Sequence, residues 1–125
     1  MPQPTLYNGG CHCGRVRFSA QLSTFSALSC NCSICSASGF LHLILEKEQF
    51  ELLSGDDALT SYRYNTGIAD HLFCKHCGIK SFYKPRSHPN GISVNIRCFD
   101  TLEITDFEIA YFEGKHWEEN VESIR

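Results

Sequence analysis

The sequence predicts a mostly β fold, in which antiparallel sheets form one small domain that is clamped by zinc. Two observations carry this prediction. Short stretches that alternate apolar and polar residues recur along the chain, and turn residues separate them. Eight cysteines are many for 125 residues, and seven of them lie in three close clusters. We expect residues 1–125 to form a single zinc-binding domain, because the length is that of one domain.

The expected strands follow one another with few residues between them. The stretch RVRFSA at 15–20 places its apolar residues on one face, and FLHLILE at 40–46 does the same with its leucines. Shorter segments of this kind lie at 49–53, 61–65, 71–74, 81–84, 92–98 and 107–113. Helical turns are expected only around 33–39 and 56–62, and neither reaches the usual length of a helix. We expect large apolar residues from the whole chain to fill the core: Leu28, Phe40, Leu43, Ile44, Phe50, Phe73, Ile96 and Trp117.

The composition excludes several classes of function. The formal net charge is −3 and there is no block of basic residues, so nucleic acid is not an expected partner. No stretch is long and apolar enough to predict a membrane span. The N-terminal MPQPTLYNGG lacks the charged-then-apolar pattern of an export signal, so we expect a cytoplasmic protein. Thiols stay reduced in the cytoplasm, which favours metal binding by the cysteines over a disulfide framework.

The first and the last cysteine clusters look like two halves of one metal site. CHCG supplies Cys11 and Cys13, and CKHCG supplies Cys74 and Cys77. Two thiolates on a tight turn can grip one zinc ion, and a glycine after the second cysteine permits the positive φ that such a turn often requires. The alternative is that these are ordinary buried thiols. A zinc closed by four thiolates is usually structural, so we expect it to tie the N-terminal hairpin to the middle of the chain.

The middle cluster, CNCSIC, supplies only three cysteines: Cys30, Cys32 and Cys35. The remaining cysteine, Cys98, shares the apolar face of its predicted strand, so we expect a buried core residue; a ligand near the metal and a redox thiol are the alternatives. A nitrogen ligand would have to come from one of the histidines: His12, His42, His71, His76, His88 or His116. Three thiolates with an open position are the arrangement of a catalytic zinc, and we favour this interpretation, with two zinc ions per chain.

A zinc ion that three thiolates hold suits sulfur chemistry better than hydrolysis. Strong donation from sulfur weakens the Lewis acidity of the metal, while its open position suits an incoming thiolate. The expected chemistry is addition of a small thiol to a carbonyl group, or cleavage of the resulting carbon–sulfur bond. Nearby cations are expected to bind carboxylates of that thiol, and the candidates, which otherwise are solvated surface residues, are Lys84, Arg86 and Arg97. The spacing singles out no group among those able to move protons: His88, Tyr83 and Asp100.

Five segments resemble, in this order, the glutathione-dependent formaldehyde-activating enzyme family, also called the centromere protein V-like family. They are GGCHCGRVRF, CNCSIC, LFCKHCG, KPRSHPNGISVNIRCFD and FEGKHWE, and the match runs from about Gly9 to Glu118. The resemblance implies a β-tent architecture, with a structural zinc at the first and last clusters and a catalytic zinc at the middle one. It also implies a carbon–sulfur lyase that condenses formaldehyde with glutathione to S-hydroxymethylglutathione.

Three functions are compatible with these residues. We favour a zinc-dependent carbon–sulfur lyase that acts on glutathione or a related small thiol. The second function is a non-catalytic, zinc-stabilised binding module, which requires a fourth protein ligand on the second zinc. The third is a thiol redox enzyme, which requires an accessible Cys98. Iron at a sulfur site is an alternative to zinc, although a mostly β, non-redox chain favours zinc.

Overall fold

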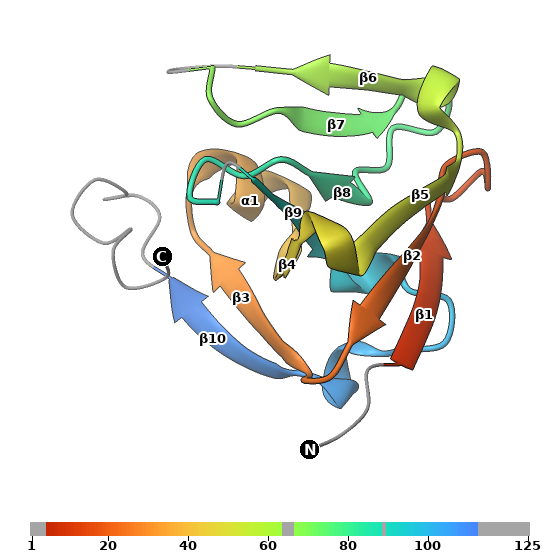
Figure 1. Cartoon of the computed structure of the whole chain (residues 1–125). Helices are drawn as coiled ribbons and strands as arrows, with labels where there is room; N and C mark the ends of the chain where they lie inside the picture. The colour runs from red at the N-terminus through yellow and green to blue at the C-terminus, as the bar shows by residue number, and fades with distance from the viewer. Residues whose placement is uncertain (1–4, 64–66, 89, 113–125) are drawn as a thin grey trace.

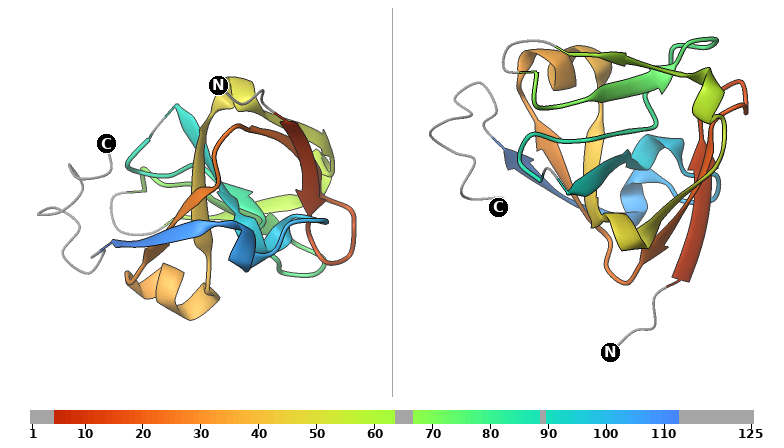
Figure 2. Two further views of the ribbon diagram at one scale, coloured as in Figure 1. Left: turned by 90° about the horizontal axis from the view of Figure 1, so that it is seen from below. Right: turned by 45° about the horizontal axis from the view of Figure 1, so that its top comes forward.

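The computed structural model describes residues 5–63, 67–88 and 90–112, and these form three sheets (Figures 1 and 2). The first sheet is antiparallel with the order β1-β2-β5, and its strands are β1 (Thr5–Gly10), β2 (Arg17–Leu22) and β5 (Phe50–Ser54). The third sheet is an antiparallel pair at the top of Figure 1, and its strands are β6 (Leu59–Tyr62) and β7 (His71–Cys74).

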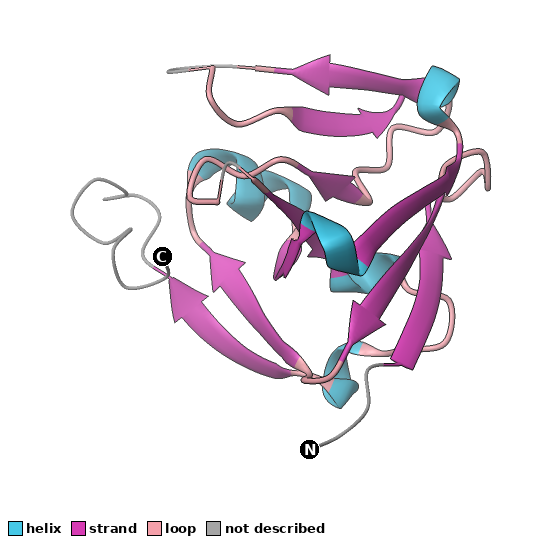
Figure 3. Cartoon of the chain, viewed as in Figure 1, coloured by secondary structure: helices cyan, strands magenta, loops and turns pink. Residues whose placement is uncertain are grey.

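The second sheet is the largest, with the order β10-β3-β4-β9-β8. Its strands are β3 (Ser26–Cys30), β4 (Leu41–Glu46), β8 (Phe82–Tyr83), β9 (Gly91–Asn95) and β10 (Glu108–Phe112). Only β10 and β3 run parallel; the other neighbours are antiparallel. Short helices connect the strands, as Figure 3 shows by colour: α1 (Ser33–Ser38) and the 3₁₀ turns η1 (Lys47–Gln49), η2 (Asp56–Ala58), η3 (Ile96–Cys98) and η4 (Ile104–Asp106). In the described part of the chain, no helix is long or apolar enough to cross a membrane.

An aromatic cluster joins the first sheet to the second. Phe18 of β2 is fully buried, and its ring centroid lies 5.6 Å from that of Phe50, 6.4 Å from that of Phe82 and 5.6 Å from that of Phe99. These distances are typical of stacked and edge-to-face aromatic pairs, which stabilise a core beyond the area that they bury. The cluster therefore fixes the position of β2 against β8 and the segment that follows β9.

The two sides of strand β4 differ: one side faces the core, and the other belongs to a more polar face of the sheet. Its leucines at 41, 43 and 45 are buried in the core, so the alternation of a strand turns His42 and Ile44 to the other side. The register pairs His42 with Leu28 of β3 and Ile44 with Ser93 of β9. We call this side of the sheet the polar face; its members include Leu28, Cys30, His42, Ile44, Tyr83, Ser93 and Asn95.

The prediction of a mostly antiparallel β domain is confirmed, with corrections at several elements. Strands β1 and β3 were not expected. The helical turn expected at 56–62 is confined to η2, and β6 begins at Leu59, before the strand expected at 61–65. The strand expected at 92–98 ends at Asn95 and continues as η3, because the Asn95 side chain accepts a hydrogen bond of 3.1 Å from the Arg97 backbone N–H and caps a 3₁₀ turn. Of the expected core residues, Phe40, Leu43 and Ile96 are buried and Phe50 packs against the core, whereas Leu28, Ile44 and Phe73 are only partly buried. Trp117 lies outside the described residues.

Candidate functional site

Four cysteines from two distant segments meet at one end of β7. Cys11 and Cys13 lie on the turn between β1 and β2, while Cys74 ends β7 and Cys77 follows it. Their sulfur atoms all lie within 4.8 Å of one another, and the Cys11–Cys13 and Cys13–Cys74 pairs are 3.6 Å and 3.7 Å apart. Zn–S bonds of about 2.3 Å in a tetrahedron place the sulfurs roughly 3.8 Å apart, so this cluster fits zinc without rearrangement.

The backbone around the four-cysteine cluster is shaped to hold it. Gly14 and Gly78 both adopt positive φ, +83° and +78°, as expected for the glycine that follows each cysteine pair. The Val16 backbone N–H donates to the Cys11 sulfur at 3.3 Å. Backbone and side-chain hydrogen bonds from Arg15 lower the pKa of the Cys13 thiol to about 6. These contacts favour thiolates, which are the form that binds metal.

The middle cluster forms where β3 ends and α1 begins. Cys30 is the last residue of β3, Cys32 is the N-cap of α1, and Cys35 lies in its first turn. The backbone bond from Ser36 N–H to the Cys32 carbonyl, 2.9 Å, closes this turn. The three sulfur atoms lie within 4.8 Å of one another. Among the described residues, no further ligand atom of a histidine, cysteine, aspartate or glutamate lies within 4.8 Å of all three.

The charge of the middle cluster favours a cation between the sulfurs. Hydrogen bonds from Cys30 and Cys35 lower the pKa of Cys32 to about 2, and the same hydrogen bonds with Cys32 and Cys30 raise the pKa of Cys35. One thiolate therefore forms readily while its neighbours keep their protons, because adjacent thiolates repel one another. A metal ion removes this repulsion and allows all three sulfurs to ionise. The donor set, three soft sulfurs, suits zinc.

His42 connects the middle cluster to the polar face. Its Nε2 lies 3.1 Å from the Cys35 sulfur, and its Nδ1 lies 3.0 Å from the Ser93 hydroxyl and 3.3 Å from that of Tyr83. Burial, together with the charge of Lys80, lowers the pKa of His42 to about 4, so the ring is neutral at pH 7. A neutral ring carries its proton on one nitrogen: with that proton on Nε2, the ring donates to a Cys35 thiolate, and Nδ1 accepts from the hydroxyls. A hydrogen bond of this kind would fix the orientation of the Cys35 sulfur as a metal ligand.

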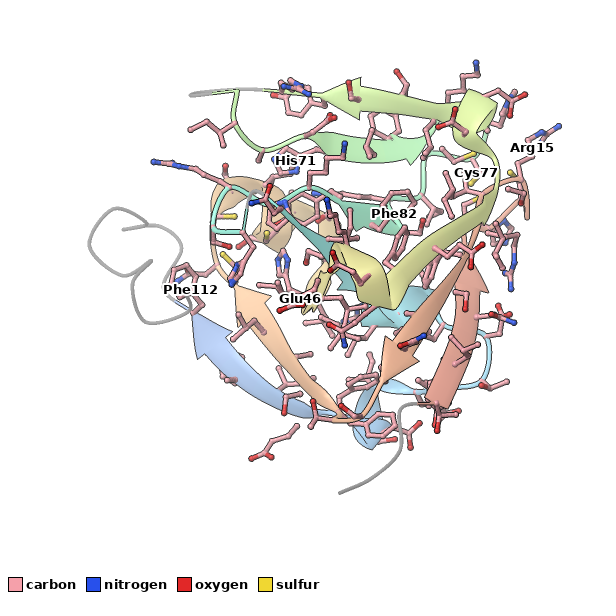
Figure 4. All side chains as sticks on the ribbon, viewed as in Figure 1. Arg15, Glu46, His71, Cys77, Phe82 and Phe112 are labelled. Carbon is pink, nitrogen blue, oxygen red and sulfur yellow. The ribbon has the colours of Figure 1, made fainter. Side chains whose placement is uncertain are left out.

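Lys80 is a cation near the middle cluster that the sequence did not single out. Its Nζ lies 2.6 Å from Nδ1 of His71, a buried residue of β7 whose ring stacks on Tyr83 with centroids 4.9 Å apart. Burial lowers the pKa of Lys80 to about 8, while the charges of Cys35 and Cys32 act in the opposite direction. Figure 4 labels His71 and Cys77 near opposite ends of β7, so Lys80 contacts the end of this strand that lies away from the four-cysteine cluster.

The three cations predicted from the sequence to bind substrate lie after β8 and in η3. Lys84 is exposed, and its backbone forms a bridge with that of Asp70. Arg86 is half-buried on the loop between β8 and β9. Arg97 is exposed, and its Nε donates to the Gly39 carbonyl at 3.0 Å, at the C-terminal end of α1.

The other candidates separate in the same way. His12 and His76 are exposed and lie between cysteines of the four-cysteine cluster, and His116 lies outside the described residues. Asp100 forms an ion pair with Arg17 at the end of the first sheet and is absent from the lining of the groove described below. Cys98 is half-buried in η3, and burial raises the pKa of its thiol to about 11, which disfavours the thiolate that redox chemistry requires.

A groove of about 1290 Å³ runs along the polar face from His42. Leu28 and Ile44 contribute apolar surface to it, and His88, on the β8–β9 loop, contributes a polar group. Glu46 and Glu108 lie in the lining farther along β4 and β10. The groove is large enough for a molecule of moderate size, and His42 is the lining residue that contacts the middle cluster.

Two comparisons with known proteins agree with this geometry. The family model described as "glutathione-dependent formaldehyde-activating enzyme" matches residues 6–115. A crystal structure of a Rhodobacter sphaeroides protein is 30% identical in sequence and superposes with a TM-score of 0.75. That match covers 83% of this chain and 98% of the other chain. The seven clustered cysteines all fall within the residues that the family model matches.

Proposed function

We propose, because this chain belongs to the glutathione-dependent formaldehyde-activating enzyme family, that it catalyses the reversible addition of a small thiol to an aldehyde. Glutathione and formaldehyde are the first pair to consider, and cleavage of their adduct would be a carbon–sulfur lyase reaction. The observation that carries the proposal is the middle cluster, in which three sulfurs lie within 4.8 Å and no fourth ligand atom joins them among the described residues. A closed four-ligand site would instead indicate a structural role.

The two cysteine clusters would have different tasks. Cys11, Cys13, Cys74 and Cys77 would hold a structural zinc, and Cys30, Cys32 and Cys35 would hold a second zinc. A zinc ion held by Cys30, Cys32 and Cys35 would supply a positive charge that favours the thiolate form of an incoming thiol. The new carbon–sulfur bond uses the sulfur lone pair, and the carbonyl π electrons move to oxygen, which takes a proton.

The residues around the cluster would support this chemistry. The hydrogen bond from His42 to Cys35 fixes one sulfur, and the hydroxyls of Ser93 and Tyr83 fix His42 in turn. This chain of contacts limits the movement of a ligand whose position decides where the open coordination site points. The groove beside His42 is large enough for the body of a tripeptide thiol, so the thiol group would reach the cluster while the remainder lies along the polar face.

NMR exchange spectroscopy of glutathione with ¹³C-formaldehyde tests the proposal. The protein should raise the rate of exchange between free and thiol-bound formaldehyde above the spontaneous rate. Cys32→Ser should abolish this increase, and Cys98→Ser, the same chemical change outside both clusters, should keep it. Equal exchange rates for the wild type and Cys32→Ser, with two metals bound in the wild type, would show that the protein does not catalyse the reaction of glutathione with formaldehyde.

One observation favours a second candidate, a binding module without turnover. His42 Nε2 already lies 3.1 Å from the Cys35 sulfur, so a modest movement of this side chain would bring a nitrogen to the metal and close the site. X-ray absorption at the zinc edge separates the two candidates. Four sulfurs at one site and three sulfurs with an exchangeable light atom at the other support the enzyme, whereas a permanent imidazole neighbour supports the module.

A further inference from the structure

Lys80 is a half-buried cation that no carboxylate neutralises in the described part of the chain. Its ammonium group lies 3.9 Å from the ring centroid of Tyr83 and 4.9 Å from that of Phe40. Aromatic faces hold a cation without competing for its protons, unlike a carboxylate. The ion pairs between described residues involve other side chains: Arg17 with Asp100, and Arg63 with Asp70.

The position of Lys80 is fixed by its neighbours rather than by solvent. Its Nζ donates to Nδ1 of His71 at 2.6 Å, and burial lowers the pKa of His71 to about 4, so this ring accepts the hydrogen bond without taking the proton. The stacking of His71 on Tyr83 holds the acceptor in place. The titratable groups that act on Lys80 or its ring partners are His71 on β7, Asp70 directly before β7, Tyr83 on β8, His42 on β4, and Cys32 and Cys35 at the N-terminal end of α1. The Asp70 carboxylate acts on His71 and forms its ion pair with Arg63.

Position and charge both indicate that this ammonium group can stabilise negative charge at the middle cluster. Contacts connect it to the cluster through two residues: Lys80 Nζ lies 3.9 Å from the ring centroid of Tyr83, the Tyr83 hydroxyl lies 3.3 Å from Nδ1 of His42, and Nε2 of His42 lies 3.1 Å from the Cys35 sulfur. Negative charge on Cys35 and Cys32 stabilises the ammonium group. Three thiolates with a divalent cation carry a net charge of −1, and an incoming thiolate makes it −2, so one nearby cation lowers the cost of binding that thiolate. Because the ion pairs between described residues do not involve Lys80, its charge is available to stabilise an anion that arrives from elsewhere.

We propose that Lys80 is a catalytic residue, whose ammonium group binds the aldehyde oxygen and gives it a proton as the carbon–sulfur bond forms. This inference rests on the proposed function. In the addition step, the sulfur lone pair forms the bond to carbon, the carbonyl π pair moves to oxygen, and the oxygen takes one proton from Nζ. The neutral amine then recovers the proton that the thiol released to water when it bound. In the cleavage direction the amine removes the hydroxyl proton, and the same bonds break in reverse. His71 is a positioning residue, since it reaches the reaction only through Lys80.

Lys80→Met and Lys80→Arg test this role, with Lys75→Met as the matched control, because Lys75 is exposed and its loss removes the same charge. Metal content is measured for each variant, and all should bind two metals. General acid catalysis typically contributes 10²–10⁴-fold, so the protein-dependent exchange rate of Lys80→Met should fall by about 100-fold or more. Lys80→Arg should keep the wild-type affinity for glutathione alone, because the charge remains, yet exchange slowly, because guanidinium does not release its proton near neutral pH.

The pH profile gives a readout that a purely structural role would not move. Lys80 acts in its protonated form and burial lowers its pKa to about 8, so the wild-type rate should decline above pH 8 after subtraction of the spontaneous rate. Lys80→Met should lack this decline. In ¹³C-lysine-labelled protein, the ε-carbon signal that Lys80→Arg removes should titrate near pH 8 and shift when glutathione is added without aldehyde.

The outcomes distinguish failure of the proposed function from failure of the role of Lys80. A wild-type rate equal to that of Cys32→Ser overturns the proposed function and the role of Lys80 together. A wild-type rate well above Cys32→Ser, with Lys80→Met as fast as Lys75→Met, overturns only the role of Lys80. An ε-carbon signal that ignores glutathione, or an alkaline decline that persists in Lys80→Met, also overturns it.

Discussion

Replacing one ligand of each cysteine cluster should have unequal effects on stability. In Cys77→Ser the four-cysteine cluster loses a ligand, and with it the connection between the N-terminal hairpin and β7. Cys13 and Cys74 are 61 positions apart, and in the chain-entropy account a cross-link of that span stabilises a protein by ~4 kcal/mol. The middle cluster spans only the six residues from Cys30 to Cys35, for which the same account gives ~2 kcal/mol. We therefore expect Cys77→Ser to cost about 2 kcal/mol more than Cys32→Ser.

Thermal unfolding followed by circular dichroism measures this difference. For a domain of this length, about 2 kcal/mol corresponds to a difference in Tm of roughly 5–10 °C. Native mass spectrometry reports the number of metals in each variant, so that stability and metal content are read from the same samples. Cys98→Ser is the control, because it makes the same substitution at a half-buried cysteine outside both clusters and should cost about 1 kcal/mol or less.

The expected difference in stability requires that the four-cysteine cluster cross-links distant segments and that the middle cluster binds its metal within one short segment. If Cys77→Ser and Cys32→Ser melt at the same temperature, or if Cys32→Ser is the less stable, the two clusters do not divide these tasks. If native mass spectra show one metal in the wild type, the assignment of a metal to each cluster is wrong as well.

Three further predictions concern single side chains. His42→Gln removes the hydrogen bond to the Cys35 sulfur and should weaken metal binding at the middle cluster by roughly 10–100-fold in competition with a chromophoric chelator, and unchanged affinity would contradict the orienting role. Phe18→Ala empties the centre of the aromatic cluster and should lower the free energy of unfolding by about 3–5 kcal/mol in urea titrations; a loss below 1 kcal/mol would show that the cluster is not the core. Arg17→Ala breaks an exposed ion pair with Asp100 and should cost at most about 1 kcal/mol without changing aldehyde exchange, whereas a large loss of exchange would restore Asp100 as a proton-transfer candidate.

The cysteine clusters could be predicted from the sequence because their information is local. CHCG and CKHCG each fix two sulfurs and a positive-φ glycine within a few residues, and the structure places the glycines as expected. Strand β3 could not be predicted in the same way. Its sequence, SALSC, shows little alternation, and it becomes a strand because β4 and β10 pair with it on both sides. The end of β9 was also missed, since the side chain of Asn95 and not the apolar pattern decides it.

The roles of His42 and Lys80 depend on contacts between elements, so spacing alone did not reveal them. A histidine in a leucine-rich strand gives no indication of which sulfur it meets until β3 and β4 are aligned. Lys80 follows the last cysteine of the four-cysteine cluster by three positions, yet its ammonium group lies 3.9 Å from the ring of Tyr83, whose hydroxyl reaches His42 beside the other cluster. The sequence predicted cations near the middle cluster and named Lys84, Arg86 and Arg97; their binding of substrate stays a prediction.

The register of β4 links the core to the middle cluster. Leu41, Leu43 and Leu45 must face the core, because they are the apolar residues that this strand contributes to it. That requirement turns His42 to the opposite face, where it lies beside Leu28 and therefore on the same side of the sheet as Cys30, two positions farther along β3. A slip of one residue would turn His42 into the leucine-lined core and leave leucines facing the sulfurs. The hydrophobic burial that folds the sheet is therefore also what places the imidazole of His42 beside the Cys35 sulfur.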